Sequence, residues 1–328
     1  MEIVEEVELC FPQLLNASCK KQMHTHFEFI LSYVTLSSIT LLTTTLNLLV
    51  IISVSHFKQL YTPSNLLLLS LAISDFFVGL LMFFQIMLID GCWFLGDLMC
   101  IMYYLLDYTI TSASVGSMVL ISIDRYVAIC DPMHYSTKVT EKRVQVSICV
   151  CWICSVVFQT LILSDNFKQP GRYNSCSGEC VVVNNYLAGL VDLVVSFIGP
   201  VTVIIVLYMR VFVVAVSQAR AMRSHIAAVT LQGSVKVTAK KSEMKAARTL
   251  GVVIVVFLIC FSPYYCVALP GDNLLNASSD AFVLCLFYFH SCLNPLIYAL
   301  FYPWFRKCIK LIGTLQILQP GSSETNIL

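Results

Sequence analysis

Charged residues are scarce in this chain. Asp, Glu, Lys and Arg make up 12% of its 328 residues, whereas a soluble domain has about 25%. The hydrophobic share is 58%, and the mean hydropathy is +0.82. This composition excludes intrinsic disorder, which requires low hydrophobicity and high net charge. It is typical of a polytopic membrane protein.

Three other features that the sequence lacks narrow the class of protein further. With only 13 Gly and 10 Pro, the chain is neither collagenous nor of low complexity. The net charge of +1 gives no electrostatic reason for a nucleic-acid partner. The start, MEIVEEVELC, has neither the basic nor the apolar region of a cleavable signal peptide. We therefore expect the first apolar run to act as its own insertion signal.

Seven apolar runs are each long enough to cross a membrane, which takes about 20 residues. They cover residues 29–54, 63–89, 98–130, 145–163, 183–216, 246–270 and 279–301. The runs are continuous rather than alternating, which excludes the strands of a membrane barrel. The expected fold is an all-α, seven-transmembrane helix bundle. Residues 1–28 would form an extracellular segment, 29–301 the bundle, and 302–328 a short amphipathic eighth helix with a cytoplasmic tail.

The positions of the basic residues predict the orientation. With the N-terminus outside, only Lys20, Lys21, Lys168 and Arg172 lie in outer segments, and the other Lys and Arg lie at inner helix ends. The sequons at Asn16 and Asn276 then both face outward, where glycosylation is possible. We expect a multi-pass plasma-membrane protein in contact with lipid.

The 15 cysteines divide between the two sides of this topology. The six in outer segments are Cys10, Cys19, Cys92, Cys100, Cys176 and Cys180. Disulfides are expected there rather than a metal site, because the compartment is oxidising and no second pair of ligands accompanies Cys176 and Cys180. On the inner side, Cys308 is either a palmitoylation site or a free structural thiol.

Asp107 is the first of three acidic residues deep in the spans. A carboxylate at a helix centre costs roughly 2.5–3.5 kcal/mol on insertion scales, so it marks function by default. Asp107 lies 18 residues, or about 27 Å of helix, before Arg125, which places it near the outer mouth. An ion pair inside the protein is the alternative, but no Lys or Arg occurs between the interfaces. We therefore expect Asp107 to bind a cationic ligand.

Asp192 provides a second anionic position at similar depth and also lacks a basic partner. Two such carboxylates would suit a ligand with two positive charges. The alternative is a hydrated Asp192, or one hydrogen-bonded to a neighbouring Ser. Aromatic rings could surround an ammonium group, although aromatics in spans more often serve packing. They are Tyr104, Tyr108, Tyr264, Tyr265 and Tyr288.

The motifs along the spans resemble those of the rhodopsin-like (class A) G protein-coupled receptors. In chain order they are Asn47, LAISD at 71–75, WFLG at 93–96 before Cys100, Asp124-Arg125-Tyr126, Trp152, Pro200, Tyr208, Pro263, and NPLIY at 294–298. Residues 290–305, HSCLNPLIYALFYPWF, resemble the terminal fingerprint of trace amine-associated receptors and depart from it only at His290.

The resemblance implies roles for particular residues. Asp107 would be the amine-binding carboxylate, with Tyr108, Thr111, Tyr264, Tyr265 and Tyr288 around it. Asp192 matches a second acid in fish members that respond to cadaverine and putrescine, which favours a diamine. Activation and G protein coupling would involve Asp124, Arg125, Tyr126, Tyr208, Glu243, Phe261, Asn294, Pro295 and Tyr298. The implied G protein is of the stimulatory, olfactory type that raises cAMP.

The resemblance also implies disulfides. It pairs Cys100 with Cys180, and an N-terminal cysteine with Cys176. Cys10 is the expected partner of Cys176, which would leave Cys19 for Cys92.

The sequence departs from the family pattern at two positions. Phe261 replaces the usual Trp of the sixth span, and His290 replaces an Asn beside a sodium pocket. That pocket would consist of Asp75, Ser114, Ser291 and Asn294. His290 therefore argues against modulation by sodium.

Other functions fit the sequence less well. A transporter would show inverted repeats and broken helices, a retinal pump needs a Lys in the seventh span, and an enzyme needs clustered ligands or an activated nucleophile. None of these is evident, so no enzyme activity, cofactor or metal is expected. Within the receptor class, the alternative is a monoamine receptor for a trace amine or a serotonin-like ligand.

Overall fold

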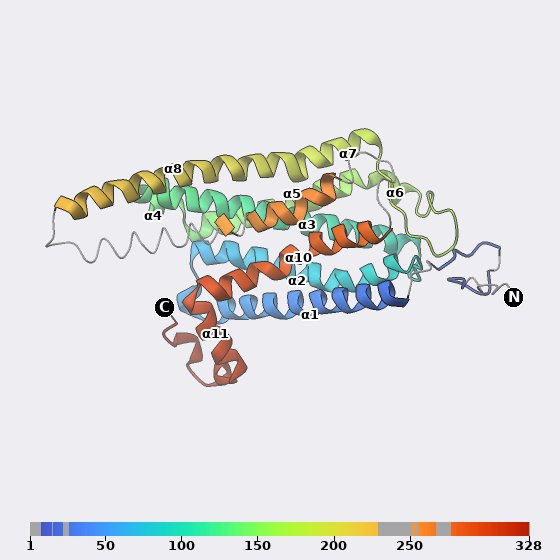
Figure 1. Ribbon diagram of the computed structural model, residues 1–328, viewed down its shortest axis with the longest axis horizontal. Coiled ribbons are helices and arrows are strands. Elements are labelled where there is room, and N and C mark those ends of the chain that lie inside the picture. Colours follow the sequence, from blue (N-terminus) through green and yellow to red (C-terminus); the bar gives the residue numbers. More distant parts are fainter. Residues whose placement is uncertain are drawn as a thin grey trace.

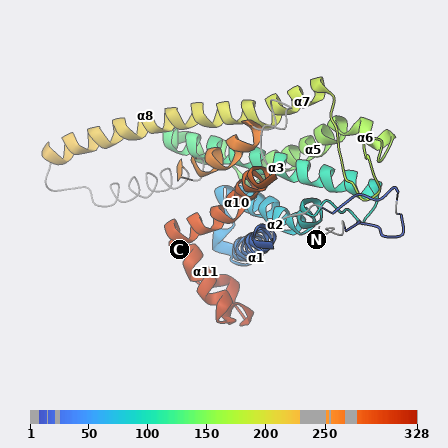
Figure 2. The same ribbon diagram turned by 45° about the vertical axis from the view of Figure 1, so that its right-hand side comes forward.

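The structure is a computed structural model that describes residues 8–14, 16–21, 26–228, 251–252, 255–266 and 277–327. Within these residues the chain is helical, and its only β-pairing is two isolated bridges. The long helices run lengthwise beside one another, whereas α11 turns away from the bundle at one end (Figure 1). The same arrangement is seen after a 45° turn (Figure 2).

Six long helical segments of the bundle are described, and we call them rods. A further helical segment covers 251–252 and 255–266. The rods are α1 (His26–His56), α2 (Pro63–Ile89), α3 (Asp97–Cys130), α5 (Glu141–Ile162), α7 (Tyr186–Leu193) continued by η3 (Val194–Ile198) and α8 (Gly199–Ala228), and α10 (Ala277–Phe301). The short elements are η1 (Lys58–Leu60), η2 (Pro132–His134), α4 (Tyr135–Lys138), α6 (Ser164–Lys168), α11 (Pro303–Gly313), η4 (Gln316–Leu318) and η5 (Ser322–Glu324).

Five described helices are long and apolar enough to cross a membrane. They are Ile30–His56, Pro63–Ile89, Asp97–Cys130, Glu141–Ile162 and Tyr186–Val214. Two shorter apolar helices, Val255–Cys266 and Phe282–Ile297, lie within the sixth and seventh predicted runs. Of the sixth run, 246–270, residues 246–250, 253–254 and 267–270 lie outside the described residues.

The fifth rod extends beyond its predicted end at residue 216. Helix α8 continues to Ala228 through SQARAMRSHIAA. This stretch contains no Gly or Pro and has four Ala and two Arg, which favour helix. The helix therefore continues past the point where the apolar run ends.

Small residues let the rods approach one another closely. A Cβ added to Gly116 of α3 would lie 2.3 Å from the Cys151 sulfur of α5, and one added to Gly79 of α2 would lie 2.6 Å from the Thr44 hydroxyl of α1. Helices in a membrane associate through this kind of close contact, because burial of apolar surface adds little there.

The fifth rod contains a π-helical turn, Val194–Ile198, directly before Pro200. Proline has no N–H and its ring clashes with the carbonyl one turn earlier, so the regular ladder cannot continue through it. The Gly199 N–H instead donates to the Val194 carbonyl. The turn lies one helical turn after Asp192, and such turns are frequent at functional sites.

Three disulfides join the N-terminal residues 8–21, the turn 90–96, the start of α3 and the loop 169–185. We call this the disulfide-bonded end. The bonds are Cys10–Cys92, Cys19–Cys176 and Cys100–Cys180. Cys100–Cys180 is the pair that the resemblance implied. The implied bond from the N-terminal segment to Cys176 is also present, but it comes from Cys19 and not from Cys10. Cys92 therefore pairs with Cys10 and not with Cys19.

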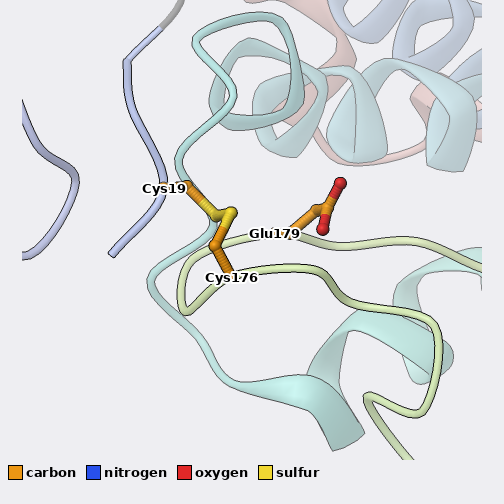
Figure 3. A group of neighbouring side chains, drawn as sticks. All are labelled: Cys19, Cys176 and Glu179. Atoms are coloured by element: carbon orange, nitrogen blue, oxygen red, sulfur yellow. A yellow bond between two sulfur atoms is a disulfide. The ribbon is translucent and has the colours of Figure 1, made fainter. Parts of the chain in front are cut away.

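Backbone pairing explains the correction. The Cys10 N–H donates to the Cys19 carbonyl at 2.9 Å, which folds the segment into a hairpin. Its second arm pairs with the loop, because the Cys19 N–H donates to the Ser177 carbonyl at 2.9 Å. Cys19 therefore lies beside Cys176 (Figure 3), and Cys10 lies next to the Gly91–Cys92 turn.

Glu179 lies near the Cys19–Cys176 bond (Figure 3). The two sulfurs are bonded to each other and offer no thiolate. The Glu179 carboxylate accepts from the Ser175 N–H at 2.5 Å and from its hydroxyl at 2.7 Å. The disulfide and these hydrogen bonds stabilise the loop, and Cys19, Cys176 and Glu179 are not a set of free metal ligands.

We predict that mutation, like peptide mapping, will show which cysteines form disulfides with each other. Cys10→Ser, Cys92→Ser and their double variant should lose surface display to the same extent, because each removes one and the same bond. Combining Cys10→Ser with Cys176→Ser should cost more than either single change. Flow cytometry of an epitope-tagged receptor measures this, and equal loss in Cys10→Ser and Cys10→Ser/Cys176→Ser would contradict it.

Helix α11 marks the opposite end of the bundle, which we call the α11 end. Trp304, Phe305 and Cys308 are buried on its inner face. The 0% exposure of Cys308 favours the free structural thiol over palmitoylation. The tail beyond α11 folds back to α1 and η1, where Lys58 bonds Glu324 at 2.9 Å and holds the pKa of that carboxyl below its ordinary value.

Candidate functional site

A cavity of about 580 Å³ opens between α3, α5, the fifth rod, the 255–266 segment and α10. All seven residues predicted to bind a ligand line it: Asp107, Asp192, Tyr108, Thr111, Tyr264, Tyr265 and Tyr288. The bundle therefore gathers side chains from four rods that are far apart in the sequence. A volume of this size suits a small organic molecule.

Asp107 projects from the middle of α3 and is 7% exposed. Its Oδ1 accepts one hydrogen bond, from the Tyr288 hydroxyl of α10 at 3.2 Å. In the described part of the chain Asp107 forms no ion pair. A buried anion with a single neutral partner is poorly compensated, so the arrangement is suited to a cation from outside the protein.

Asp192 lies on α7 and borders the same cavity. Its Oδ1 accepts from the Ser196 hydroxyl at 2.8 Å and from Gln159 Nε2 of α5 at 3.1 Å. The hydrogen bond to a neighbouring Ser, expected as the alternative for this residue, is therefore present. It does not neutralise the carboxylate, and neither hydrogen bond uses Oδ2.

Aromatic rings form much of the wall. The ring centres of Tyr104 and Tyr108 of α3 lie 5.8 Å apart, and those of Tyr264 and Tyr265 lie 5.4 Å apart. Phe197 stacks on Tyr265 with 4.2 Å between ring centres. The faces of such rings attract ammonium groups, so the wall complements the two carboxylates.

Sequence reasoning missed several polar residues of the cavity. Gln85 and Gln159 line it, as do Asn184 and Asn185 of the loop before α7. A glutamine inside an apolar run is as unusual as a carboxylate, and Gln159 stands in the otherwise apolar stretch SVVFQTLIL. That signal would have found both glutamines.

A second polar centre lies around Asp75. The carboxylate accepts from Ser114 at 3.3 Å, Ser291 at 3.0 Å and Asn294 at 2.8 Å. His290 Nε2 lies 3.8 Å from Asp75 Oδ1, so the residues predicted for a sodium pocket do meet. They fit sodium poorly, since both carboxylate oxygens already accept hydrogen bonds and an imidazole nitrogen stands among what should be oxygen ligands.

Phe261 lies between the two centres and is fully buried. Its ring centre is 4.1 Å from Phe257, 4.6 Å from Phe287 and 4.4 Å from His290. Phe287 lines the ligand cavity, while His290 contacts the Asp75 centre. The cluster therefore connects the cavity floor with the interior of the bundle.

A third polar centre lies at the α11 end of α3. Asp124 accepts from Arg125 at 2.5 Å, Ser64 at 3.0 Å and Tyr135 at 2.8 Å. Tyr302 lines the same small cavity as Asp124 and Arg125. Nearby, hydrogen bonds from Lys138 and then His134 lower the pKa of Asp131. This network ties the Arg125 guanidinium to Asp124 and Ser64.

Some predicted residues cannot be placed. Glu243 and Asn276 lie outside the described residues, and so does the Tyr298 side chain. Of the others, Tyr126 packs near the Ile129–Val211 contact between α3 and α8, and the Tyr208 hydroxyl of α8 is buried. Asn16 is exposed at the disulfide-bonded end, as a glycosylation site requires.

The chain is similar to known proteins along most of its length. A family model described as 7 transmembrane receptor (rhodopsin family) matches residues 46–298. Trace amine-associated receptor 13c of Danio rerio is 36% identical over 337 residues, which cover 98% of this chain and 96% of that receptor. Receptor 8a of Rattus norvegicus is also 36% identical, and receptor 4 of Mus musculus is 32% identical, with the same coverage.

Proposed function

Because the chain belongs to the trace amine-associated receptors of the rhodopsin family, we propose that it is a receptor for diamines. Membership makes it a seven-helix, multi-pass plasma-membrane protein that couples to a G protein, and not an enzyme. The proposal adds the ligand class, the residues that bind it, and a stimulatory G protein that raises cAMP.

One observation carries the diamine proposal: two carboxylates, Asp107 and Asp192, line one cavity of about 580 Å³ and neither has a basic partner in the described chain. A monoamine could neutralise only one of them. A ligand with an ammonium group at each end satisfies both, and its apolar linker lies against the tyrosine wall.

We further propose that the disulfide-bonded end faces the outside of the cell. Disulfides form in oxidising compartments, and the cavity lies toward this end. The α11 end, with Arg306, Lys307 and Lys310 on its short helix, would then face the cytosol, in accord with the positive-inside rule.

Activation would begin at the fifth rod. A ligand bound at both carboxylates pulls Asp192 toward α3, and the π-helical turn before Pro200 is the part of that rod best able to yield. The displacement repacks Val115 and Phe257 and shifts Phe261, which moves the sixth span outward. Arg125 is then free to leave Asp124 and contact the G protein. The ligand shifts this equilibrium only by its differential affinity for the two states.

A monoamine receptor is the alternative, and the Danio rerio and mammalian relatives are equally compatible with it. The test is a cAMP reporter assay in cells with verified surface display, run with alkyl monoamines, phenethylamine, serotonin and α,ω-diamines. Diamines should activate at the lowest concentrations. Activation by monoamines with silence to every diamine would replace the proposal by the alternative, and silence to all amines would reject both.

We predict that sodium hardly modulates this receptor. Exchanging sodium for a bulky organic cation should change diamine affinity less than about twofold, because His290 and three hydrogen-bond donors already surround Asp75. His290→Asn should introduce a sodium effect of about fivefold or more. Radioligand competition measures both values, and a fivefold effect in the unmodified receptor would contradict the prediction.

A further inference from the structure

Gln159 is almost completely buried, with 2% exposure, yet it borders the ligand cavity. It lies in the last turn of α5 and contacts Asp192 of α7 and Ser196 of η3. Its Nε2 donates to Asp192 Oδ1 at 3.1 Å and to the Ser196 hydroxyl oxygen at 3.4 Å. Its Oε1 is buried and has no hydrogen-bond partner in the described part of the chain.

Chemistry fixes which end of the Gln159 amide is which. An ionised carboxylate can only accept, so the amide atom that contacts Asp192 must be the nitrogen. The Ser196 hydroxyl donates its single proton to Asp192, so it too needs a donor from Gln159. Turning the amide over would set its oxygen against two acceptors. The orphaned atom is therefore the acceptor oxygen.

A buried acceptor without a partner carries an uncompensated desolvation penalty, and such acceptors are rare in native proteins unless a ligand, an ion or water satisfies them. The neighbouring Asp192 has an oxygen, Oδ2, that neither of its hydrogen bonds uses. The two acceptors belong to hydrogen-bonded side chains that both line the cavity. An N–H donor with positive charge would satisfy both.

We infer that Gln159 is a ligand contact: its Oε1 and the Asp192 carboxylate together accept the N–H groups of the distal primary ammonium of an α,ω-diamine. This rests on the proposed function and adds a specificity-determining residue to it. A primary ammonium presents three N–H donors, so it can bond both acceptors at once. A quaternary ammonium has none and would leave Oε1 unsatisfied.

The competing role is structural, since Gln159 also holds Asp192 in place. The two roles separate in a receptor that lacks Asp192. If Gln159 acts only through Asp192, changing it in an Asp192→Ala background has no further effect on diamines. If Gln159 contacts the ligand, the change still costs diamine affinity there.

The experiment measures cadaverine and pentylamine affinity by competition binding on four receptors: unmodified, Gln159→Met, Asp192→Ala and the double variant. Methionine matches the length and shape of glutamine but offers only a weak acceptor. We expect Gln159→Met to weaken cadaverine about tenfold and pentylamine less than twofold, as for loss of one hydrogen bond to a charged group. In the Asp192→Ala background a loss of about threefold or more should remain for cadaverine.

Two further variants serve as controls. Gln145→Leu changes a glutamine on the exposed part of α5, outside the cavity, and should leave both ligands unaffected. Gln159→Glu, if neutral in its buried place, still offers a carbonyl acceptor and an O–H for Asp192, so it should keep cadaverine affinity within about threefold. If the methionine variant does not reach the surface, this variant decides: a tenfold loss with intact display overturns the inference.

The outcomes separate the inference from the function on which it rests. If no amine binds the unmodified receptor, the proposed function fails. If cadaverine binding depends on Asp192 but is unchanged by Gln159→Met, the inference alone fails. It also fails if the effect of Gln159→Met disappears in the Asp192→Ala background, which would make Gln159 purely a positioning residue.

Discussion

Replacing Asp107 by Asn should lower the affinity for every amine by at least about 100-fold. The exchange keeps the size of the side chain and an oxygen that can accept from Tyr288 at the present 3.2 Å, but it removes the charge. Breaking one partner of a buried ion pair costs about 3–5 kcal/mol, and each 1.4 kcal/mol is tenfold in affinity. Competition binding on membranes measures the loss directly.

Asp90→Asn is the matched control for Asp107→Asn. Asp90 is also an acidic residue near the disulfide-bonded end, in the turn that follows α2, but it bonds the Tyr33 hydroxyl and does not line the cavity. Its replacement should leave amine affinity within about threefold. Equal losses in the two variants would mean that a general fall in negative charge, and not a contact at Asp107, weakens binding.

Replacing Asp192 by Asn should affect diamines selectively. A diamine would lose the partner of its second ammonium, whereas a monoamine held at Asp107 would lose nothing. We expect cadaverine affinity to fall about 30- to 100-fold and pentylamine affinity to change less than threefold. The smaller loss than at Asp107 follows from the intermediate burial of Asp192, which leaves it better solvated.

The Asp192 variant needs a control for local structure, because Asp192 also accepts from Ser196 and Gln159. Ser196→Ala removes one of these donors and keeps the charge. It should weaken cadaverine by less than about fivefold. A Ser196→Ala receptor as impaired as Asp192→Asn would show that the geometry of the rod, rather than the charge, governs diamine binding.

The bundle and the two carboxylates that line its cavity could be predicted from sequence for the same physical reason. In a chain with so few charges, apolar runs bounded by charge must be spans, and a carboxylate within a run is conspicuous. The seven predicted cavity residues lie together because the family motifs fix the register of each helix. The five long candidate spans and the two shorter helices fall on the predicted runs.

Features that depend on contacts between distant segments could not be predicted. The partners of Cys10 and Cys19 were predicted wrongly, although Cys100–Cys180 was predicted correctly. The hairpin at Cys10 and Cys19 forms through backbone hydrogen bonds, which carry no sequence signature. The Gln159 network was missed because a neutral amide attracts less notice than a carboxylate. The end of the fifth rod was placed too early because helix propensity, not hydropathy, carries α8 to Ala228.

The three acids of the spans also differ in a way that only the structure reveals. Asp75 is surrounded by three donors and an imidazole and has no share in the ligand cavity. Asp107 has one neutral donor, and Asp192 has two donors on one oxygen. The number of hydrogen bonds that each carboxylate already accepts distinguishes the internal polar centre at Asp75 from the two carboxylates that border the cavity.

The central claim is that the second ammonium of the ligand pairs with Asp192. The most direct measurement is the affinity ratio of cadaverine to pentylamine, which differ by one terminal ammonium, in the unmodified receptor and in Asp192→Asn. We expect a ratio above about 30 in the unmodified receptor and of about three in the variant, where only the Gln159 contact to the second ammonium remains. A ratio that is the same in both receptors would contradict it.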